Sequence, residues 1–305
     1  MDEKHRSELK REAAPAEILF DCAMKDYTTI RVGGKADVIC FPEDGEQLRK
    51  IVLCLRQKGI PYLPVGKGSN LLVRDGGINC AIIILKGKLA AIKRDIENSC
   101  SVIAGAGVSL SELLIYCSRN GLGDAEFLAG IPGTLGGAVA MNAGAFEKEI
   151  KSLVRGIRVI TEDGKEEKID SSQLCFGYRR LALSKGVILL DVLLQLKEER
   201  PEVISEKISG FLKQRKKNQP LEYPSGGSVF KNPPNDYAGR LIEEAGLKGK
   251  KIGNAMISEK HANFIVNTGN ARAADIIALM ETAQKTVRER TGIDLEPEIR
   301  IVGTD

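Results

Sequence analysis

Hydrophobic residues are grouped along the chain in two ways, as short apolar runs that suit buried strands and as longer stretches of helical period. Between residues 38 and 65 a strand, a helix and a second strand alternate in the manner of a βαβ unit. Helices are expected at 44–58 and at 109–121, where Ser109 and Glu112 can form a capping box. A short helical lead-in is expected at 15–24. Strands are expected at 38–41, 60–65, 80–85, 101–104, 153–161, 165–169 and 187–196.

The pattern changes near Pro201, where charged residues surround the proline and indicate a boundary. A helix is expected at 202–217, followed by a loop at 219–234 that four prolines and two glycines make stiff. The remaining elements are a helix that Gly246 stops, two short strands, a long amphipathic helix and a final strand. They are expected at 237–245, 255–258, 264–267, 273–290 and 298–302.

One apolar, glycine-rich stretch, residues 123–145, matches neither period. Pro132 and the glycines interrupt any regular element, which predicts tight turns with exposed backbone amides. Small residues let the main chain approach a large flat ligand, and amides without partners in the chain can bind its phosphates. A glycine-rich turn buried against a helix is the alternative. The glycines lie at positions 130, 133, 136, 137 and 144.

Two further glycine turns follow expected strands. The segment 66–70, Gly-Lys-Gly-Ser-Asn, lacks the spacing of a P-loop, but its small polar residues can donate hydrogen bonds to a pyrophosphate. A plain turn between strands explains it equally well. Gly105 and Gly107 form a GxG pair, but Leu110 stands where a third glycine is required, so the Rossmann fingerprint is not met.

Composition is ordinary for a globular protein, with 43% hydrophobic and 28% charged residues and a net charge of +4. No apolar run is long enough to span a membrane, and the charged N-terminus does not resemble a secretory signal. The one dense basic run, 213–217, falls at the end of an expected helix, where cations interact favourably with the helix dipole. Aromatic residues make up only 5% of the chain, which argues against nucleic-acid binding.

Cysteine and histidine usage limits the possible chemistry. The seven cysteines are odd in number, widely spaced and form no CxxC, which indicates reduced thiols and a cytoplasmic location. The two histidines, His5 and His261, do not have the spacing of metal ligands or of a catalytic triad, so no metal site is expected.

Proton transfer must therefore be carried out by Ser228, Glu298 or Tyr178, while Arg179 and Arg180 can stabilise negative charge. Serine without an adjacent base is a poor nucleophile, but it is a credible proton donor to a basic carbanion or enolate. This chemistry favours hydride transfer from a cofactor. The loop at 219–234 is expected to be anchored by its apolar pair at 229–230 rather than to be a free linker.

Six segments, in order and across nearly the whole chain, give this sequence a specific resemblance. It resembles the UDP-N-acetylenolpyruvoylglucosamine reductases, flavoenzymes that complete UDP-N-acetylmuramic acid for peptidoglycan synthesis. The glycine segments alone would fit other enzymes of the same flavin-binding fold. The matching segments are 27–34, 64–72, 129–137, 177–179, 227–233 and 296–300.

The resemblance implies an α+β protein, with the two-subdomain FAD-binding fold of the vanillyl-alcohol oxidase/PCMH type followed by a C-terminal α+β substrate domain. The expected segments are 1–85 with the helical lead-in, 86–200 and 201–305. FAD is expected along the loop 66–72 and the stretch 123–145. The implied FAD-binding residues are Arg31, Gly66, Lys67, Gly68, Ser69, Asn70, Leu71, Gly130, Ile131, Pro132, Gly133, Thr134, Gly136, Gly137 and Ala138.

The resemblance also implies a reaction. NADPH reduces FAD and leaves, the enolpyruvyl sugar nucleotide takes its place, and the flavin N5 hydride goes to C3 of the substrate. Ser228 then protonates C2, Arg179 neutralises the substrate carboxylate, and Glu298 helps to polarise it. Tyr178, Lys231 and Asn232 are implied substrate contacts, although the last two could simply be solvated at a loop tip.

The short distance from Ser228 to the C-terminus resembles the family type without an inserted substrate-covering loop. The tyrosine that closes the site in the longer type therefore has no assigned counterpart here. No nucleic acid, membrane or obligate protein partner is implied. The alternatives are an FAD-dependent sugar or alcohol oxidase of the same fold and a catalytically inactive nucleotide-sugar sensor. The segments expected to bind FAD, 66–72 and 123–145, contain no histidine or cysteine for a covalent flavin link, which disfavours the oxidase. All three catalytic positions are retained, which disfavours the inactive sensor.

Overall fold

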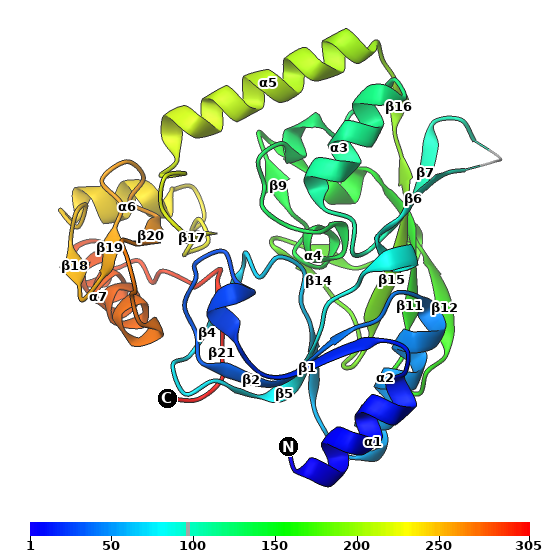
Figure 1. Cartoon of the computed structure of the whole chain (residues 1–305). Helices are drawn as coiled ribbons and strands as arrows, with labels where there is room; N and C mark the ends of the chain where they lie inside the picture. The colour runs from blue at the N-terminus through cyan, green and yellow to red at the C-terminus, as the bar shows by residue number, and fades with distance from the viewer. Residues whose placement is uncertain (96–97) are drawn as a thin grey trace. The chain divides into compact units, whose positions relative to one another are not determined.

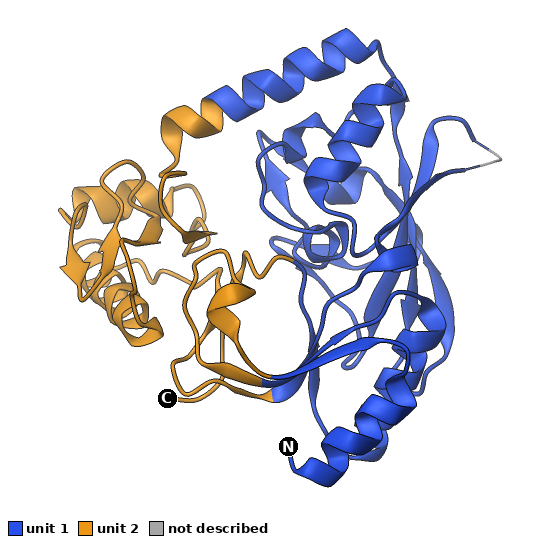
Figure 2. Cartoon of the chain, viewed as in Figure 1, with its two compact units in different colours: residues 1–20, 37–66, 80–213 blue, residues 21–36, 67–79, 214–305 orange. Residues whose placement is uncertain are grey.

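The computed structural model describes residues 1–95 and 98–305 and divides into two compact units (Figures 1 and 2). Unit 1 comprises residues 1–20, 37–66 and 80–213, and unit 2 comprises residues 21–36, 67–79 and 214–305. The chain therefore passes several times from one unit to the other. The expected division at residues 85 and 200 stays a prediction.

The first half of unit 1 contains helices packed on a four-stranded sheet of order β1-β2-β5-β3. Helix α2 connects β2 to β3, which are separated in the sheet by β5, and β3 pairs in parallel with β5. Asp44 caps α2 by accepting a hydrogen bond from the backbone amide of Gln47, so the helix expected there is confirmed. The elements are α1 (Glu3–Ala13), β1 (Glu17–Ala23), β2 (Lys35–Phe41), α2 (Gly45–Gln57), β3 (Tyr62–Pro64) and β5 (Ile78–Ile83).

The helical lead-in expected at 15–24 is wrong. The helix is α1, which begins at Glu3, and residues 17–23 form strand β1. Ile18 and Phe20 pack toward the core while their neighbours Glu17 and Leu19 are exposed, which is the period of two of an edge strand. Pro15 has no backbone amide with which to continue the helix.

The second half of unit 1 is built on an antiparallel five-stranded sheet of order β12-β11-β15-β7-β6. Alternate residues such as Val102, Ala104, Val192 and Leu194 are buried on one face of it. The strand predictions here are confirmed, including the hairpin that turns at Gly164 with φ of +77°. The strands are β6 (Ile92–Arg94), β7 (Ser101–Gly105), β11 (Val154–Ile160), β12 (Glu166–Asp170) and β15 (Ile188–Gln195).

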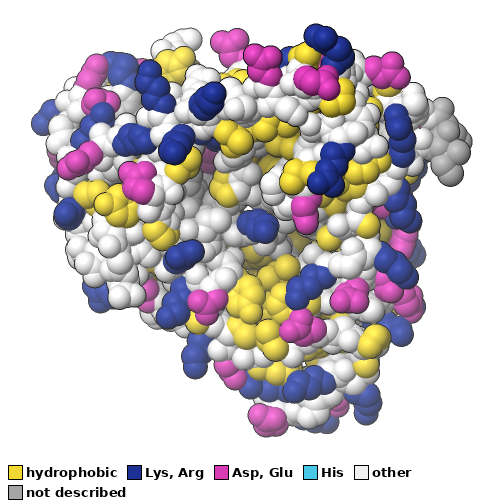
Figure 3. Space-filling view, turned by 45° about the horizontal axis from the view of Figure 1, so that its top comes forward, with side chains coloured by type: hydrophobic (Ala, Val, Ile, Leu, Met, Phe, Trp, Pro, Cys, Tyr) yellow, Lys and Arg dark blue, Asp and Glu magenta, His cyan; other side chains and the backbone are white. Residues whose placement is uncertain are grey.

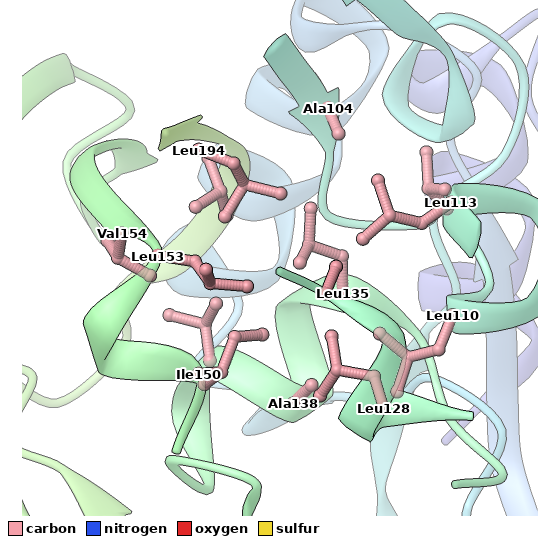
Figure 4. Close-up of a cluster of buried hydrophobic side chains, with 14 of the residues drawn as sticks. Ala104, Leu110, Leu113, Leu128, Leu135, Ala138, Ile150, Leu153, Val154 and Leu194 are labelled. Carbon is pink, nitrogen blue, oxygen red and sulfur yellow. The ribbon is translucent and has the colours of Figure 1, made fainter. Parts of the chain in front are cut away.

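Helices α3 (Leu110–Arg119) and α4 (Leu135–Ala140) cover the buried face of this sheet. Figure 4 shows Leu110 and Leu113 from α3, and Leu135 and Ala138 from α4, in one apolar cluster. The capping box of α3 is formed as expected. Three small antiparallel pairs complete the unit: β8 (Leu122–Gly123) with β16 (Lys197–Glu198), β9 (Gly144–Ala145) with β10 (Lys148–Glu149), and β13 (Phe176–Gly177) with β14 (Arg180–Leu181).

Helix α5 (Pro201–Asn218) begins in unit 1 and ends in unit 2, as the colour change in Figure 2 shows. In unit 2, an antiparallel sheet of order β17-β20-β19-β18 packs with α6 and α7 around Phe230, Leu241 and Ile276. Strand β4 pairs in parallel with β21. The elements are β4 (Leu71–Val73), β17 (Ser225–Ser228), α6 (Ala238–Glu244), β18 (Lys251–Ile252), β19 (Ala255–Ile257), β20 (Phe264–Asn267), α7 (Ala273–Thr291) and β21 (Arg300–Val302).

The surface carries both signs of charge. Figure 3 shows Lys and Arg side chains interspersed with Asp and Glu side chains on the visible face, in keeping with the small net charge. Within the described part of the chain, no helix has both the length and the apolar character that crossing a bilayer requires.

Asp75 ties the loop after β4 to the start of α7. Its two carboxylate oxygens accept hydrogen bonds from the amides of Ala273 (2.8 Å) and Ala274 (2.9 Å), which have no acceptor inside the helix. We expect Asp75→Ala to lower the free energy of unfolding of unit 2 by about 0.5–2 kcal/mol in urea denaturation. Glu281→Ala, at an exposed position of α7, is the matched control and should change it little. Equal stability of the two variants would contradict the capping role.

Candidate active site

The glycine-rich stretch in unit 1 is more regular than the sequence pattern indicates. After a short 3-10 turn at Glu126–Leu128, residues 135–140 form helix α4, and the Thr134 hydroxyl caps it by accepting a hydrogen bond from the Gly137 amide. The expectation of tight turns is therefore wrong for residues 135–140. Gly136 and Gly137 lie inside a helix because the packing of α4 on the apolar cluster outweighs their low helix propensity.

The expectation of open backbone amides is also wrong at the start of α4. The Leu135 amide donates to the Val108 carbonyl (2.7 Å), and the Gly136 amide donates to the Ala106 carbonyl (2.8 Å). The Ala138 amide donates to the Thr134 carbonyl (2.9 Å). These amides have hydrogen-bond partners inside unit 1, so they are not available to bind a phosphate.

Close main-chain packing also explains the glycines of the GxG pair, Gly105 and Gly107, which do not belong to a Rossmann motif. A Cβ added at Gly105 would lie 2.3 Å from the Leu89 carbonyl oxygen, and one at Gly107 would lie 2.6 Å from that of Leu85. A Cβ added at Gly136 would lie 2.7 Å from the Cβ of Ala106. These glycines are required for close main-chain packing beneath the candidate site.

The exposed residues of this stretch are mostly glycine and proline. Gly130, Pro132 and Gly137 are exposed, whereas Leu128 and Leu135 are buried in the cluster of Figure 4. A Cβ added at Gly137 would touch only Thr134 Oγ1, at 3.5 Å, so the space above it is open. A ligand can approach the main chain closely at such a position.

The first glycine turn meets this surface within unit 1. A Cβ added at Gly66 would lie 2.4 Å from Thr134 Oγ1, so the main chain at Gly66 lies directly against the cap of α4. Gly66 and Thr134, which are 68 positions apart in the sequence, are therefore neighbours, in keeping with the assignment of both segments to FAD binding.

The rest of that turn lies in unit 2. Gly68 has φ of +62°, and a Cβ there would lie 2.3 Å from the Tyr27 carbonyl oxygen, so only glycine is accommodated. The Asn70 side-chain amide donates to the Glu298 carbonyl at 3.1 Å, and the Arg300 amide donates to the Asn70 carbonyl at 3.0 Å. Asn70 is thereby fixed next to a predicted catalytic residue.

Ser228 and Glu298 are brought together by backbone pairing in unit 2. The Glu298 amide donates to the Val229 carbonyl at 2.8 Å, and the Lys231 amide donates to the Glu296 carbonyl at 2.9 Å. Both Ser228 and Glu298 are half-buried, while Val229 is buried as expected. Two of the three predicted catalytic residues therefore sit on adjacent main-chain segments.

Asn263 is a buried residue that the sequence reasoning missed. Its side chain accepts a hydrogen bond from the Phe230 amide (2.9 Å) and donates one to the Phe230 carbonyl (2.8 Å). Its own carbonyl accepts from the Val229 amide (2.9 Å). This clamp fixes the two residues that follow Ser228. The only signal in the sequence was an asparagine at the start of an apolar strand.

The predicted substrate contacts in unit 2 already have partners in the protein. Lys231 Nζ lies 2.5 Å from a carboxylate oxygen of Glu296, which is 70% exposed. Asn232 Oδ1 accepts a hydrogen bond from the Ala238 amide at the start of α6. A surface ion pair of this kind is weak, so Lys231 can exchange Glu296 for an incoming anion at little cost.

Arg31 is exposed, with φ of +55°, in a turn that another buried asparagine supports. The Asn267 side-chain amide donates to the carbonyls of Ile30 (3.1 Å) and Arg31 (3.3 Å). The Thr29 hydroxyl donates to the Ser225 carbonyl at 2.7 Å, which joins this turn to the strand that carries Ser228.

Arg179 lies in unit 1, at the turn of the β13–β14 hairpin, with φ of +55°. Its guanidinium Nη1 donates to the Gly144 carbonyl at 3.2 Å, and its Cζ lies 5.3 Å from the ring centre of Tyr178. Tyr178 is 49% exposed. The compact turn expected at 175–180 is confirmed, and it places the arginine at the end of the glycine-rich stretch.

The predicted site residues thus form one group in each unit. Unit 1 holds Gly66, the residues from 130 to 138, Tyr178 and Arg179; unit 2 holds Arg31, the residues from 67 to 71, Ser228, Lys231, Asn232 and Glu298. In the described part of the chain, no group of three or more His, Cys, Asp or Glu side chains is arranged to hold a metal ion.

Comparison with known proteins identifies both parts of the chain. Residues 36–170 match the family described as FAD binding domain, and residues 219–302 match the C-terminal domain of UDP-N-acetylenolpyruvoylglucosamine reductase. The enzyme of that name from Syntrophus aciditrophicus (strain SB) is 45% identical, over 94% of this chain and 93% of its own. The chain belongs to the UDP-N-acetylenolpyruvoylglucosamine reductase family.

Two further relatives agree over nearly the same span. The reductase of Clostridium botulinum (strain 657 / Type Ba4) is 43% identical over 94% of this chain and 93% of its own. The crystal structure of UDP-N-acetylenolpyruvylglucosamine reductase from Thermus caldophilus matches with a TM-score of 0.80 and 39% identity, covering 94% of this chain and 99% of the other.

Membership of the reductase family confirms the resemblance seen in six motifs, the α+β fold with an FAD-binding domain and a C-terminal domain, and FAD as the cofactor. Membership of this family makes the chain an oxidoreductase. This argues against the alternative of an inactive nucleotide-sugar sensor and favours a reductase over a sugar or alcohol oxidase. The individual FAD contacts stay predictions.

Alanine substitutions at the two adjacent glycines of α4 should distinguish an effect on FAD binding from an effect on folding. We expect Gly137→Ala to leave the fold intact, because alanine stabilises a helix relative to glycine by about 1 kcal/mol. Its methyl group should occupy the open space and weaken FAD binding to the apoprotein by roughly tenfold or more, a change of about 1.4 kcal/mol. Gly136→Ala should instead lower the melting temperature, because its Cβ meets Ala106.

Gly210→Ala is the matched control, since Gly210 lies in α5 and a Cβ there has no neighbour within 4 Å. It should gain the same helix propensity and titrate with FAD like the wild type. Wild-type FAD affinity in Gly137→Ala would remove Gly137 from the flavin site.

Proposed function

We propose that this chain catalyses the NADPH-dependent reduction of the enolpyruvyl group of UDP-N-acetylglucosamine enolpyruvate, giving UDP-N-acetylmuramate for peptidoglycan precursor synthesis. The observation that carries the proposal is the backbone pairing of the Ser228 and Glu298 segments beside Asn70. It gives a proton donor and a carboxyl group fixed positions on one face of unit 2, in a chain whose family has this activity.

The residues predicted to hold FAD lie in the turn 66–71 and in the stretch 130–138, and the cofactor, reduced by NADPH, would supply a hydride to C3 of the enolpyruvyl group. Electron density then accumulates at C2 and on the substrate carboxylate. The Ser228 hydroxyl donates its proton to C2, which completes the addition of one hydride and one proton across the double bond. Asn263 holds the main chain of the two residues that follow Ser228, and this pre-organisation of the backbone favours the proton transfer.

Arg179 and Glu298 act on the substrate carboxylate. The Arg179 guanidinium neutralises the carboxylate as it gains charge, and charge-assisted hydrogen bonds of this kind are about twice as strong as neutral ones. Glu298 polarises the same group, either as a neutral acid or through Arg179, because two unscreened carboxylates would repel each other.

Lys231, Asn232 and Tyr178 bind the nucleotide-sugar substrate. Lys231 offers a flexible ammonium group to the diphosphate, which replaces the exposed Glu296 as its partner. Asn232 keeps its side-chain NH2 group for the ligand while its oxygen caps α6. The exposed Tyr178 ring, next to Arg179, offers an apolar face with a polar tip to the sugar.

A cytoplasmic location is part of the proposal. All seven cysteines are free thiols in the described structure. Burial raises the pKa of Cys40 to about 12 and, with the nearby charge of Glu126, that of Cys117 to about 12, so both stay protonated and unreactive at neutral pH.

Replacing Ser228 should separate the two half-reactions. We expect Ser228→Ala to keep its bound FAD and to be reduced by NADPH at the wild-type rate. Flavin reoxidation by the enolpyruvyl sugar nucleotide should be slowed by roughly 10²–10⁴-fold, the usual contribution of a general acid. Stopped-flow absorbance of the flavin measures both rates.

Ser225→Ala, at the other end of the same strand, is the control and should support both half-reactions, since Ser225 contributes only its backbone carbonyl to the contact with Thr29. Equal slowing of both half-reactions in Ser228→Ala would count against the proton-donor role. Reoxidation by oxygen but not by the sugar nucleotide in the wild-type enzyme would count against the proposed substrate.

A further inference from the structure

Asn142 is the polar side chain that is most completely buried in unit 1, with 0% exposure among the described residues. It follows Met141, the C-cap of α4, and has φ of +41°, the left-handed conformation that commonly ends a helix. Glycine is the usual residue at such a position, and asparagine is the next best. The backbone conformation alone therefore does not explain why a buried amide stands here.

The side chain of Asn142 joins three segments. Its Nδ2 donates to the Gly177 carbonyl at 3.0 Å, and its Oδ1 accepts from the Lys151 amide at 3.3 Å. Gly177 belongs to the β13–β14 hairpin, and Lys151 belongs to the 3-10 turn Ile150–Ser152. Because a buried hydrogen bond is shielded from competing water, these contacts hold the hairpin to the end of α4.

Arg179 is also held by the segment that follows Asn142. Its Nη1 donates to the carbonyl of Gly144, which pairs with Glu149 across the β9–β10 hairpin. Burial alone would raise the pKa of the Glu149 carboxyl, but Lys151, Asn142 and the charge of Arg179 keep this pKa below its usual value. The hydrogen bond to the Gly144 carbonyl thus holds the guanidinium against the β9–β10 hairpin.

We propose that Asn142 is a positioning residue for Arg179. Its side chain connects the end of helix α4 to the β13–β14 hairpin, which carries the arginine. This inference rests on the proposed function, in which Arg179 neutralises the substrate carboxylate. Without the Asn142 amide, the Gly177 carbonyl loses its anchor and the hairpin can shift. A displacement of about 1 Å at a catalytic group can slow a reaction by about 10²-fold.

The test compares Asn142→Gly and Asn142→Asp with the wild type as FAD-bound, full-length enzymes. Glycine keeps the left-handed backbone and removes the amide, whereas aspartate keeps the size and the acceptor for Lys151 but carries no amide donor for Gly177. Both should be reduced by NADPH at nearly the wild-type rate. Flavin reoxidation by the enolpyruvyl sugar nucleotide should be about 10- to 100-fold slower.

A wild-type reoxidation rate in either variant that binds FAD would overturn the inference, because the Asn142 side chain would then not be needed to position Arg179. Equal slowing of both half-reactions would also overturn it. Val159→Ala, which removes buried side chain from the same apolar cluster on β11, controls for general destabilisation and should slow neither half-reaction selectively.

A double-mutant cycle separates this inference from the proposed function. In an Arg179→Ala background, adding Asn142→Gly should slow reoxidation further by less than about threefold, since both changes disable the same guanidinium. Fully multiplicative effects would overturn the role of Asn142 and leave that of Arg179. An Arg179→Ala enzyme with wild-type reoxidation would instead show that the proposed role of Arg179 is wrong.

Discussion

A backbone surface that receives a flat ring must be free of side chains on its outer side, yet its own polar groups need partners within the chain. Helix α4 meets both requirements. Its first amides donate to Val108, Ala106 and Thr134, and Gly136 lies so close to Ala106 that no side chain fits between them. Gly137, one residue further on, faces open space. The inner glycine permits close packing, and the outer one leaves the open space that the proposed FAD contact requires.

Buried asparagines carry out the same task at three places around the candidate site. Asn142, Asn263 and Asn267 each donate a side-chain hydrogen bond to a main-chain carbonyl. Each of those carbonyls lies within two residues of a predicted site residue. The side-chain amide suits this task because it both donates and accepts, so it can fix a loop without adding a charge to the interior. These hydrogen bonds restrain the main chain next to the predicted site residues.

Most of the fold could be predicted from the sequence, because long amphipathic helices and buried strands carry a strong periodic signal. The helix expected at 15–24 failed because these residues pair with the neighbouring strand β2 while Ile18 and Phe20 pack against the core, and a strand of this kind is defined by its partner. Strand β17 was missed for the same reason. Its residues, Ser-Gly-Gly-Ser, have little strand propensity, and only its pairing with β20 makes it a strand.

The sequence by itself determined the family, the cofactor class and the candidate residues Arg179, Ser228 and Glu298, because these depend on residue types at fixed positions in motifs. The tertiary structure decided which of those residues are neighbours and what holds them. The pairing of Val229 with Glu298, the contact of Gly66 with Thr134 and the anchoring of Gly177 by Asn142 all join residues far apart along the chain. Such contacts leave no local pattern, because a hydrogen bond between distant segments depends on the packing of everything between them.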